Sequence, residues 1–345
     1  MKRILFIKLG AIGDVIQAAA AIDEYRRLNT EVQVDWVIGK AIADLLQGMA
    51  LADRVIAISD QALFSGSLIK RIVAVIKVWI QMLPQMRSYD GIYLAHTSWQ
   101  YELLTIPAYL RNPQRLLKKI RRFYPRLTEY RVSEYLIFIS GVGITSIDGA
   151  LILQRLGKRL LENSPSAKVD TLLRGAQKKW VALIPGGAKN MARDDFLRRW
   201  PVQYYVELSQ LLIAQGYGVL LLGGKTDEWV SPLFNGLAVK DLIGQTSLSE
   251  TVNLIAQVNL LVSHDSGPFH LATLTSTPLV GIFGPTPVSA VAPLGRKYLS
   301  IFKADASVIC SPCYDGFAYA PCKNPVCMRS TRVDAVFAEI TNLLV

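Results

Sequence analysis

Short apolar runs alternate with amphipathic segments along most of this sequence. Apolar runs of strand length cover residues 3–8, 32–38, 55–58 and 91–94 in the first half, and 180–184, 218–222, 260–263 and 279–283 in the second. Segments with helical periodicity lie between or after them, at 15–28, 41–49, 204–215, 249–256, 268–274 and 333–344. Strands that alternate with helices in this way predict parallel sheets covered by helices on both faces. We therefore expect the α/β fold class, with two Rossmann-like halves that bind ligands outside the carboxyl ends of their strands.

A polar segment at residues 162–177, with Ser, Pro and Lys, separates the two halves and predicts a linker. We expect an N-terminal domain at 1–165 and a C-terminal domain at 178–345, facing a cleft. The last helix is a candidate to pack back on the N-terminal domain. The 345 residues, 51% of them hydrophobic, supply enough apolar material for a core in each domain. The same composition excludes a disordered, collagen-like or coiled-coil chain.

The start of the sequence resembles a signal peptide only superficially, because Lys8 interrupts its apolar run and Asp14 follows. No segment predicts a transmembrane helix, so we expect a cytoplasmic protein. Its cysteines would then be reduced or metal-bound rather than paired in disulfides. Cys310 and Cys313 have the CxxC spacing of a metal site, while Cys322 and Cys327 are spaced more loosely. A structural zinc or iron and plain reduced thiols both remain open.

Positive charge is concentrated in one part of the chain. The net charge is +11, and residues 61–128 hold eleven basic and two acidic side chains, which is +9. Within this part, residues 68–83 predict a mostly apolar helix with Lys70, Ala74, Lys77 and Gln81 on one narrow stripe. Such a helix is either nearly buried or lies in a membrane interface.

A basic run at residues 111–126 has seven positive charges and no acid. It is either a solvated basic segment or a surface for an anionic membrane or lipid-linked substrate, and the neighbouring apolar helix favours the second interpretation. The residues that we expect to bind this lipid-linked substrate or the membrane are Lys118, Lys119, Arg121 and Arg122. Nucleic acid is not the expected partner, because no helix-turn-helix, zinc-finger or RNP pattern is present. These features predict peripheral association with the inner face of the cytoplasmic membrane.

The turns after the predicted strands carry the candidate chemistry. In GAIGD at 10–14, glycine allows close backbone approach to a ligand, and Asp14 is either a helix cap or a general base. The turn lacks GxGxxG, so support for NAD binding is weak, and GGKT at 223–226 lacks the spacing of a phosphate-binding Walker loop. SHDSGPFH at 263–270 can present backbone N–H groups to a diphosphate, with Asp265 and His270 at the rim. GPT at 284–286 ends the next strand and supports the same pocket.

Five motifs together resemble a known family. They are RILFIKLGAIGDVIQAAAAI at 3–22, PGG at 185–187 with RRWP at 198–201, LLGGKTDE at 221–228, SHDSGPFHLA at 263–272 and GIFGPT at 281–286. In this order they closely resemble the ADP-heptose:lipopolysaccharide heptosyltransferases of glycosyltransferase family nine. The resemblance covers essentially the whole chain. It implies a GT-B fold and inverting, metal-independent transfer from a nucleotide-diphosphate sugar, with the acceptor bound mainly by the N-terminal domain and the donor by the C-terminal domain.

The resemblance also implies roles for single residues. Asp14 matches the catalytic aspartate that deprotonates the acceptor hydroxyl, and Arg199 stands where the family usually has a lysine near the diphosphate. The implied donor-binding residues are Gly13, Gly186, Gly187, Arg199, Asp227 or Glu228, Asp265, Ser266, Gly267, His270 and Thr286. The expected function is transfer of a sugar, heptose from ADP-heptose, to a lipopolysaccharide core or similar anionic glycolipid, with no cofactor required for catalysis. Two alternatives remain: a relative with another nucleotide-sugar donor, and a non-enzymatic basic protein that binds membranes or nucleic acid.

Overall fold

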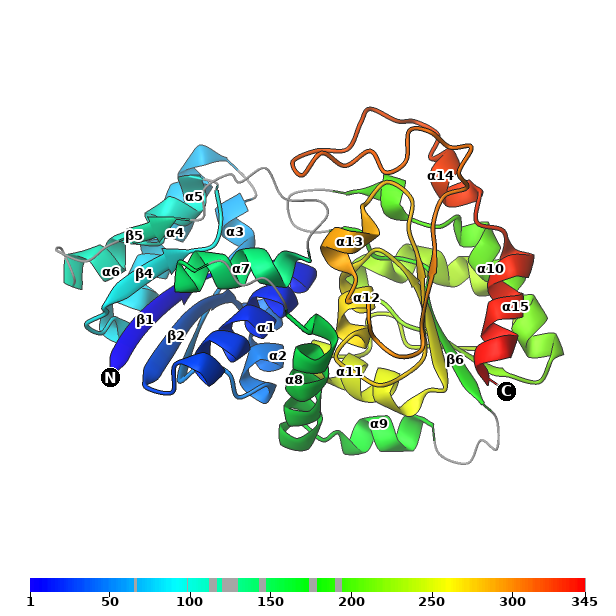
Figure 1. Ribbon diagram of the computed structural model, residues 1–345, viewed down its shortest axis with the longest axis horizontal. Helices are drawn as coiled ribbons and strands as arrows, with labels where there is room; N and C mark the ends of the chain where they lie inside the picture. Colours follow the sequence, from blue (N-terminus) through cyan, green and yellow to red (C-terminus); the bar gives the residue numbers. More distant parts are fainter. Residues whose placement is uncertain are drawn as a thin grey trace. The chain divides into compact units, whose positions relative to one another are not determined.

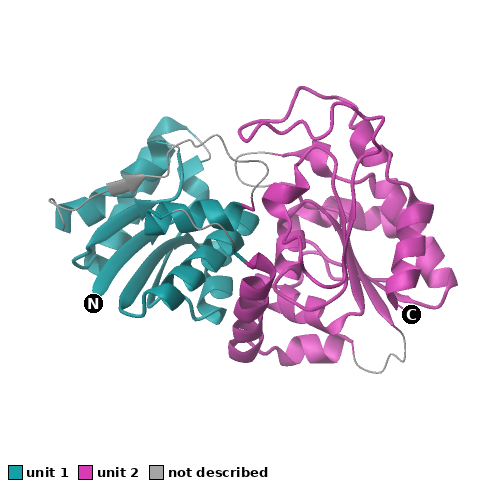
Figure 2. Cartoon of the chain, viewed as in Figure 1, with its two compact units in different colours: residues 1–126, 131–147 teal, residues 127–130, 148–345 magenta. Residues whose placement is uncertain are grey.

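Two compact units make up the chain in the computed structural model (Figure 2). One unit contains residues 1–126 and 131–147, and the other contains 127–130 and 148–345. The structure describes residues 1–64, 67–97, 99–111, 117–119 (backbone only), 130–142, 147–173, 179–189 and 194–344. Within these ranges, no helix is both long enough and apolar enough to cross a bilayer.

The first unit is built on a five-stranded parallel sheet (Figure 1). Its strands are β1 (Lys2–Ile7), β2 (Val32–Gly39), β3 (Arg54–Ile58), β4 (Gly91–Leu94) and β5 (Leu117–Lys119), in the order β3-β2-β1-β4-β5. The strand order reverses between β1 and β4, so this is the switch point at which ligands bind in such sheets. β1 therefore lies in the middle of the sheet, and the residues that follow it stand at the expected ligand-binding edge.

Helices cover both faces of this sheet. The alanine-rich α1 (Ile12–Leu28) lies beside α7 (Arg131–Ser140), and the short α2 (Ala43–Gly48) follows a 3-10 turn at Lys40–Ile42. Four other helices share a buried core with one face of the sheet: α3 (Gln61–Phe64), α4 (Leu68–Met82), α5 (Trp99–Leu103) and α6 (Ile106–Arg111). A 3-10 turn at Leu83–Gln85 ends α4. The strands are nearly continuous apolar runs because both of their faces are buried.

The second unit contains a six-stranded parallel sheet of order β11-β10-β9-β6-β7-β8. The strands are β6 (Trp180–Ile184), β7 (Gly218–Leu221), β8 (Val239–Asp241), β9 (Leu260–His264), β10 (Leu279–Ile282) and β11 (Leu299–Phe302). Its helices are α8 (Gly149–Asn163), α9 (Ala167–Leu172), α10 (Val202–Ala214), α11 (Leu248–Gln257), α12 (Gly267–Ala272), α13 (Val288–Val291), α14 (Val326–Arg329) and α15 (Val333–Leu344), with 3-10 segments at Phe196–Arg198 and Lys225–Phe234. This arrangement confirms the predicted α/β class.

The boundary between the units differs from the predicted linker at 162–177. Residues 149–163 form α8, which Asp148 caps by accepting a hydrogen bond from the Leu151 amide at 3.0 Å. α8 belongs to the second unit because its apolar face is buried there and its Gly157 lies against the Leu274 carbonyl. A Cβ on Gly157 would stand 1.6 Å from that oxygen, so the two backbones meet at the closest distance that glycine allows. The second unit thus begins at the turn before α8, earlier than the polar composition indicated.

The last helix contributes to the core of the second unit. Val336 and Ile340 of α15 are fully buried in the same apolar cluster as Leu208 and Leu212 of α10. α15 therefore packs on its own unit, where its apolar face completes the core of the second sheet.

Candidate functional site

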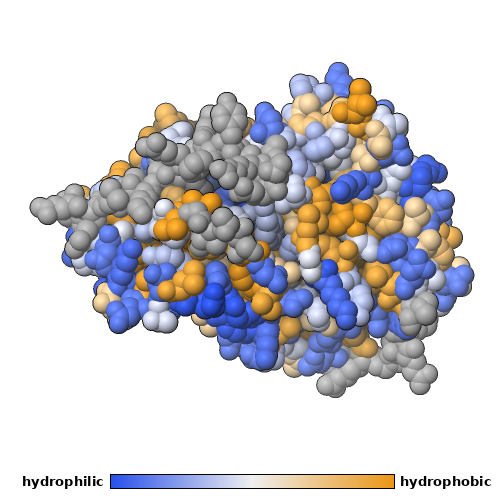
Figure 3. Space-filling view, viewed as in Figure 1, coloured by the Kyte–Doolittle hydropathy of each residue, from blue (hydrophilic) through white to orange (hydrophobic). Residues whose placement is uncertain are grey.

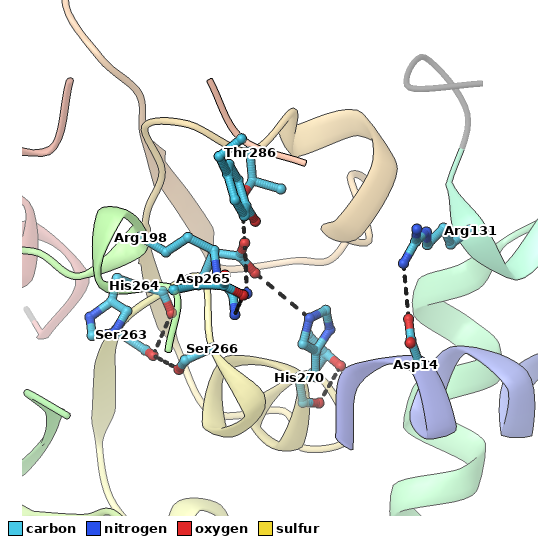
Figure 4. A network of polar contacts seen from close by, with 12 residues as sticks. Asp14, Arg131, Arg198, Ser263, His264, Asp265, Ser266, His270 and Thr286 are labelled. Carbon is cyan, nitrogen blue, oxygen red and sulfur yellow. Dashed lines mark hydrogen bonds and ion pairs between the residues drawn. The ribbon is translucent and has the colours of Figure 1, made fainter. Parts of the chain in front are cut away.

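Asp14 is held by two cations in the first unit. It lies in the first turn of α1, just after β1, and its two carboxylate oxygens are paired separately. Lys8 Nζ lies 2.9 Å from Asp14 Oδ2. Arg131 Nη1 lies 2.9 Å from Asp14 Oδ1 (Figure 4). The Lys8 side chain is only 4% exposed, whereas that of Asp14 is 26% exposed. The carboxylate is thus fixed from within the unit and still reaches solvent.

The backbone around Lys8 explains this placement. Lys8 continues β1 by donating its N–H to the Val37 carbonyl at 3.1 Å, and its own carbonyl accepts from the buried Trp36 Nε1 at 3.0 Å. These bonds hold the ammonium group at the sheet edge where α1 begins. Arg131 comes from α7, which packs beside α1.

The charge of Asp14 follows from these pairs. Burial by itself would raise the pKa of Asp14, but Lys8 and Arg131 outweigh it and hold the pKa well below its usual range. Asp14 also raises the pKa of Lys8, against the effect of burial. The helix-cap alternative has no support, because Ala11 is the N-cap of α1 and no side chain caps it. Asp14 is therefore a permanently ionised carboxylate at neutral pH.

A neutral histidine lies in the same electrostatic environment. His96 follows β4, and its ring stacks on that of Tyr101 with centroids 3.8 Å apart and planes 6° apart. The pKa of His96 is lowered to about 4, mainly by burial and also by the charge of Lys8, while Asp14 opposes the shift. Sequence reasoning did not single out Lys8, Arg131 or His96 as functional. For Lys8 and His96 a signal was available, since each is a polar residue at the carboxyl end of a central strand.

Asp265 is the centre of a second polar group, which lies in the second unit after β9. Its Oδ2 accepts a 2.7 Å hydrogen bond from Thr286 Oγ1 and lies 3.3 Å from Arg198 Nη1 (Figure 4). Its Oδ1 lies 3.9 Å from His270 Nε2. Burial would raise the pKa of Asp265, but Arg198, His270 and the Thr286 hydroxyl together lower it. The structure therefore brings two other predicted donor-binding residues, His270 and Thr286, to the ionised, buried carboxylate of Asp265.

Two neighbouring arginines have different roles in this group. Arg199, which the family resemblance singled out, donates from Nε to the Gly187 carbonyl at 2.9 Å and pairs with Asp194. Its guanidinium also lies 5.6 Å from the centroid of the Trp229 ring. Arg198, which sequence reasoning did not single out, makes the ion pair with Asp265. The sequence RRWP contains no feature that distinguishes the two before the chain folds.

Asp227 joins two glycine turns. Its Oδ1 accepts from the Gly187 amide at 2.8 Å and its Oδ2 from the Gly224 amide at 2.9 Å. Gly187 has φ +84°, and a Cβ on Gly186 would stand 2.6 Å from the Asp227 Cβ, so both of these positions in the PGG turn need glycine. Asp227 is buried and Glu228 is exposed. Asp227 therefore positions the PGG turn, and Glu228 is the acidic residue of the two that reaches solvent.

The remaining predicted residues include three that the structure places and four whose side chains it does not describe. Ser266 Oγ lies 3.1 Å from Ser263 Oγ within the Asp265 loop, and Gly267 begins α12. Gly13 lies beside Asp14 in the first unit, whereas the other predicted donor-binding residues belong to the second unit. Four others lie outside the residues whose side chains the structure describes: Lys118, Lys119, Arg121 and Arg122.

The cysteines do not form a metal centre as placed. Cys310 and Cys322 are exposed, Cys313 is half-buried and Cys327 is buried, and all four are free thiols. Across the described part of the chain, no group of three or more His, Cys, Asp or Glu could hold a metal ion. The structure thus gives the predicted zinc or iron site no support.

Comparison with known proteins places these residues in a family context. The model of glycosyltransferase family 9 (heptosyltransferase) matches residues 148–314, which include both the Asp265 loop and the PGG turn. The lipooligosaccharide heptosyltransferase 2 of Haemophilus influenzae is 36% identical over 107 residues, which are 29% of this chain and 31% of that protein. The chain thus matches about a third of the length of this curated relative.

The similarity to solved structures extends over nearly the whole chain. The ADP-heptose lipopolysaccharide heptosyltransferase II of Escherichia coli has a TM-score of 0.71 at 20% identity, covering 100% of this chain and 98% of its own. The E. coli heptosyltransferase WaaC with ADP has a TM-score of 0.67 at 18% identity, covering 99% of each chain. The resemblance to family nine is confirmed, and so is the GT-B fold class.

Proposed function

We propose that this protein is an inverting glycosyltransferase of family nine that transfers heptose from ADP-heptose to a lipopolysaccharide core or a similar anionic glycolipid. One observation carries the proposal: the buried loop around Asp265 lies within the region that matches the family, and its side chains converge as a donor site requires. The similarity to heptosyltransferases of known structure, one of them solved with ADP, supports the choice of donor.

The proposed reaction breaks the bond from the anomeric carbon to the diphosphate and forms a bond to an acceptor oxygen. Negative charge develops on the leaving diphosphate, so cations and N–H groups placed in advance lower the barrier. Arg198 and Arg199 supply the cations, and the backbone of the loop from Ser266 to Gly267 supplies N–H groups. Because Arg199 is tied to Gly187 and Arg198 to Asp265, both guanidinium groups are held in place before the donor binds.

Asp14 takes the proton from the acceptor hydroxyl in this proposal. A carboxylate with a lowered pKa is a weak base, so the proton moves only as the new C–O bond forms and the hydroxyl becomes acidic. Lys8 and Arg131 keep the carboxylate ionised and aimed, and the 26% exposure of Asp14 leaves room for the acceptor. No metal has a role in either step.

The acceptor side of the proposal rests on charge. Residues 61–128 carry +9 of the net charge, which suits an anionic glycolipid at the inner face of the cytoplasmic membrane. Acceptor binding by Lys118, Lys119, Arg121 and Arg122 is part of this proposal.

The test measures transfer and nucleotide binding separately. Purified protein is incubated with ADP-heptose, UDP-, GDP- and CMP-linked sugars and a heptose-deficient lipopolysaccharide acceptor, and thermal stability is recorded with each free nucleotide. We expect transfer from ADP-heptose and stabilisation by ADP, about 2.7 kcal/mol at a hundred times its Kd. Asp14→Asn should lower kcat by about 10²–10⁴-fold and leave stabilisation by ADP unchanged. Transfer from another donor would show that the protein uses a different nucleotide-sugar. If neither transfer nor nucleotide binding were found, the proposal would be overturned in favour of a non-enzymatic binding protein.

A further inference from the structure

The outer surface of α4 is unusually apolar for a solvent-facing helix. Exposed apolar residues (orange in Figure 3) occur over both units, and singly they need no explanation. α4 differs because six of its fifteen residues are large, apolar and 44–75% exposed: Leu68, Ile69, Ile72, Val73, Ile76 and Ile80. We call these six residues the α4 outer face.

Helical geometry makes the α4 outer face continuous. At 100° per residue, its members fall within an arc of about 140°, from Leu68 to Val73. The opposite side of the helix, with Ala74, Val75, Val78 and Met82, is buried against the sheet. α4 therefore has one apolar side that builds the core of the unit and a second apolar side that faces outward. The sequence left open whether this helix is nearly buried or interfacial, and the structure excludes the first option.

Positive charge borders the α4 outer face. Lys70 and Lys77 project about 180–200° from Leu68 on the helical wheel, next to Val73, and both are exposed. The helix contains Arg71 as a third cation and no acidic residue. An apolar strip edged by lysines is the composition of helices that lie in a membrane interface, where the ammonium groups reach the lipid headgroups.

We propose that the α4 outer face docks the first unit on an anionic phospholipid bilayer, with the six apolar side chains among the acyl chains and Lys70 and Lys77 at the headgroups. Charge favours this occupant over a second copy of the chain. Two copies pairing through this helix would bring six cations together with no acid on either helix. An anionic bilayer supplies both the apolar layer and the opposite charge.

The docking is independent of the chemistry at Asp14 and Asp265, so its test can fail or succeed separately from the proposed function. We would measure sedimentation with vesicles of phosphatidylcholine containing 30% phosphatidylglycerol, and with pure phosphatidylcholine vesicles. The test variant is Ile69→Gln/Ile72→Gln/Ile76→Gln, since glutamine keeps helix propensity. The matched control is Leu28→Gln/Leu151→Gln/Leu211→Gln, which removes three exposed apolar side chains from three other helices.

We expect the α4 variant to bind the anionic vesicles about a hundredfold more weakly than wild type, because three apolar side chains no longer enter the bilayer, and the control to bind as wild type does. Lys70→Glu/Lys77→Glu should weaken binding to the anionic vesicles by about tenfold or more. Equal binding by the α4 variant and the control would overturn the proposal. So would a wild-type dimer in lipid-free sedimentation velocity that the α4 variant alone converts to monomer, because the α4 outer face would then be a subunit interface. Thermal melts that match wild type within a few degrees show that the variants are folded.

Discussion

Replacing Lys8 by methionine tests the electrostatic basis of the Asp14 site. The substitution keeps a long side chain in a nearly buried position but removes the charge 2.9 Å from the Asp14 carboxylate. At that distance and an effective dielectric constant of about 20, the attraction is about 6 kcal/mol, equivalent to about 4 pKa units as an upper limit. Opposite charges so close typically lower a carboxyl pKa by about 1–3 units, and Arg131 remains as a second partner. We therefore expect the Asp14 pKa to rise by about 2 units in Lys8→Met.

The assay is an NMR titration of protein labelled with ¹³C at the aspartate carboxyl carbons, with Asp14→Asn identifying the Asp14 signal. In wild type this signal should not move between about pH 8 and pH 4, because its pKa lies well below the ordinary value of about 3.9. In Lys8→Met it should begin to titrate within the accessible acidic range. Lys2→Met is the control, since Lys2 lies six residues earlier on β1, about 20 Å away and beyond the screening length of about 8–10 Å. A wild-type midpoint near 3.9, or no difference between Lys8→Met and wild type, would refute the reasoning.

Three further predictions concern the second unit. Arg198→Met should raise the Asp265 pKa and reduce stabilisation by ADP in thermal melts, and unchanged stabilisation would remove Arg198 from the donor site. Because folding lowers the Asp265 pKa, the ionised carboxylate stabilises the wild-type fold above about pH 4, and this contribution is lost as the pH falls further. Gly157→Ala should lower the free energy of unfolding in urea by at least about 1–3 kcal/mol, because the new Cβ would overlap the Leu274 carbonyl. Gly216→Ala is the control: its Cβ meets open space, so it should lower the free energy of unfolding by about 1 kcal/mol from its positive φ alone. Tyr205→Phe removes the 3.0 Å bond to His264 Nδ1 in the core and should cost about 1–3 kcal/mol by the same measurement, and a neutral result would show that the bond contributes nothing.

Much of the architecture could be predicted from sequence because parallel strands and their helices have local signatures. Apolar runs such as 180–184 and 260–263 coincide with β6 and β9 to within a residue, since a strand buried on both faces must be apolar throughout. The predicted linker was wrong, because polar composition was taken to indicate an exposed connecting segment. Residues 162–177 are polar enough for a linker, yet the end of α8 and all of α9 lie within them, because a helix needs only one apolar face to pack.

The candidate site, too, could be predicted from the sequence only in part. The motif at 263–270 marked the Asp265 loop because its small residues, glycine and acid follow a buried strand directly, and each of these features is local. Which arginine pairs with Asp265 could not be predicted, since Arg198 and Arg199 are adjacent and only the turn at Phe196–Arg198 directs them differently.

The sequence by itself therefore determined the fold class, the strand ends that carry chemistry and the identity of Asp14 as a candidate base. Only the tertiary structure decided how Asp14 is charged, because Arg131 lies 117 residues away in the chain and meets it through the packing of α7 on α1. The same holds for α4, whose two apolar sides look alike in the sequence. Packing against the sheet buries one of them and leaves the other at the surface, because a helix beside a sheet can cover only the side that faces it.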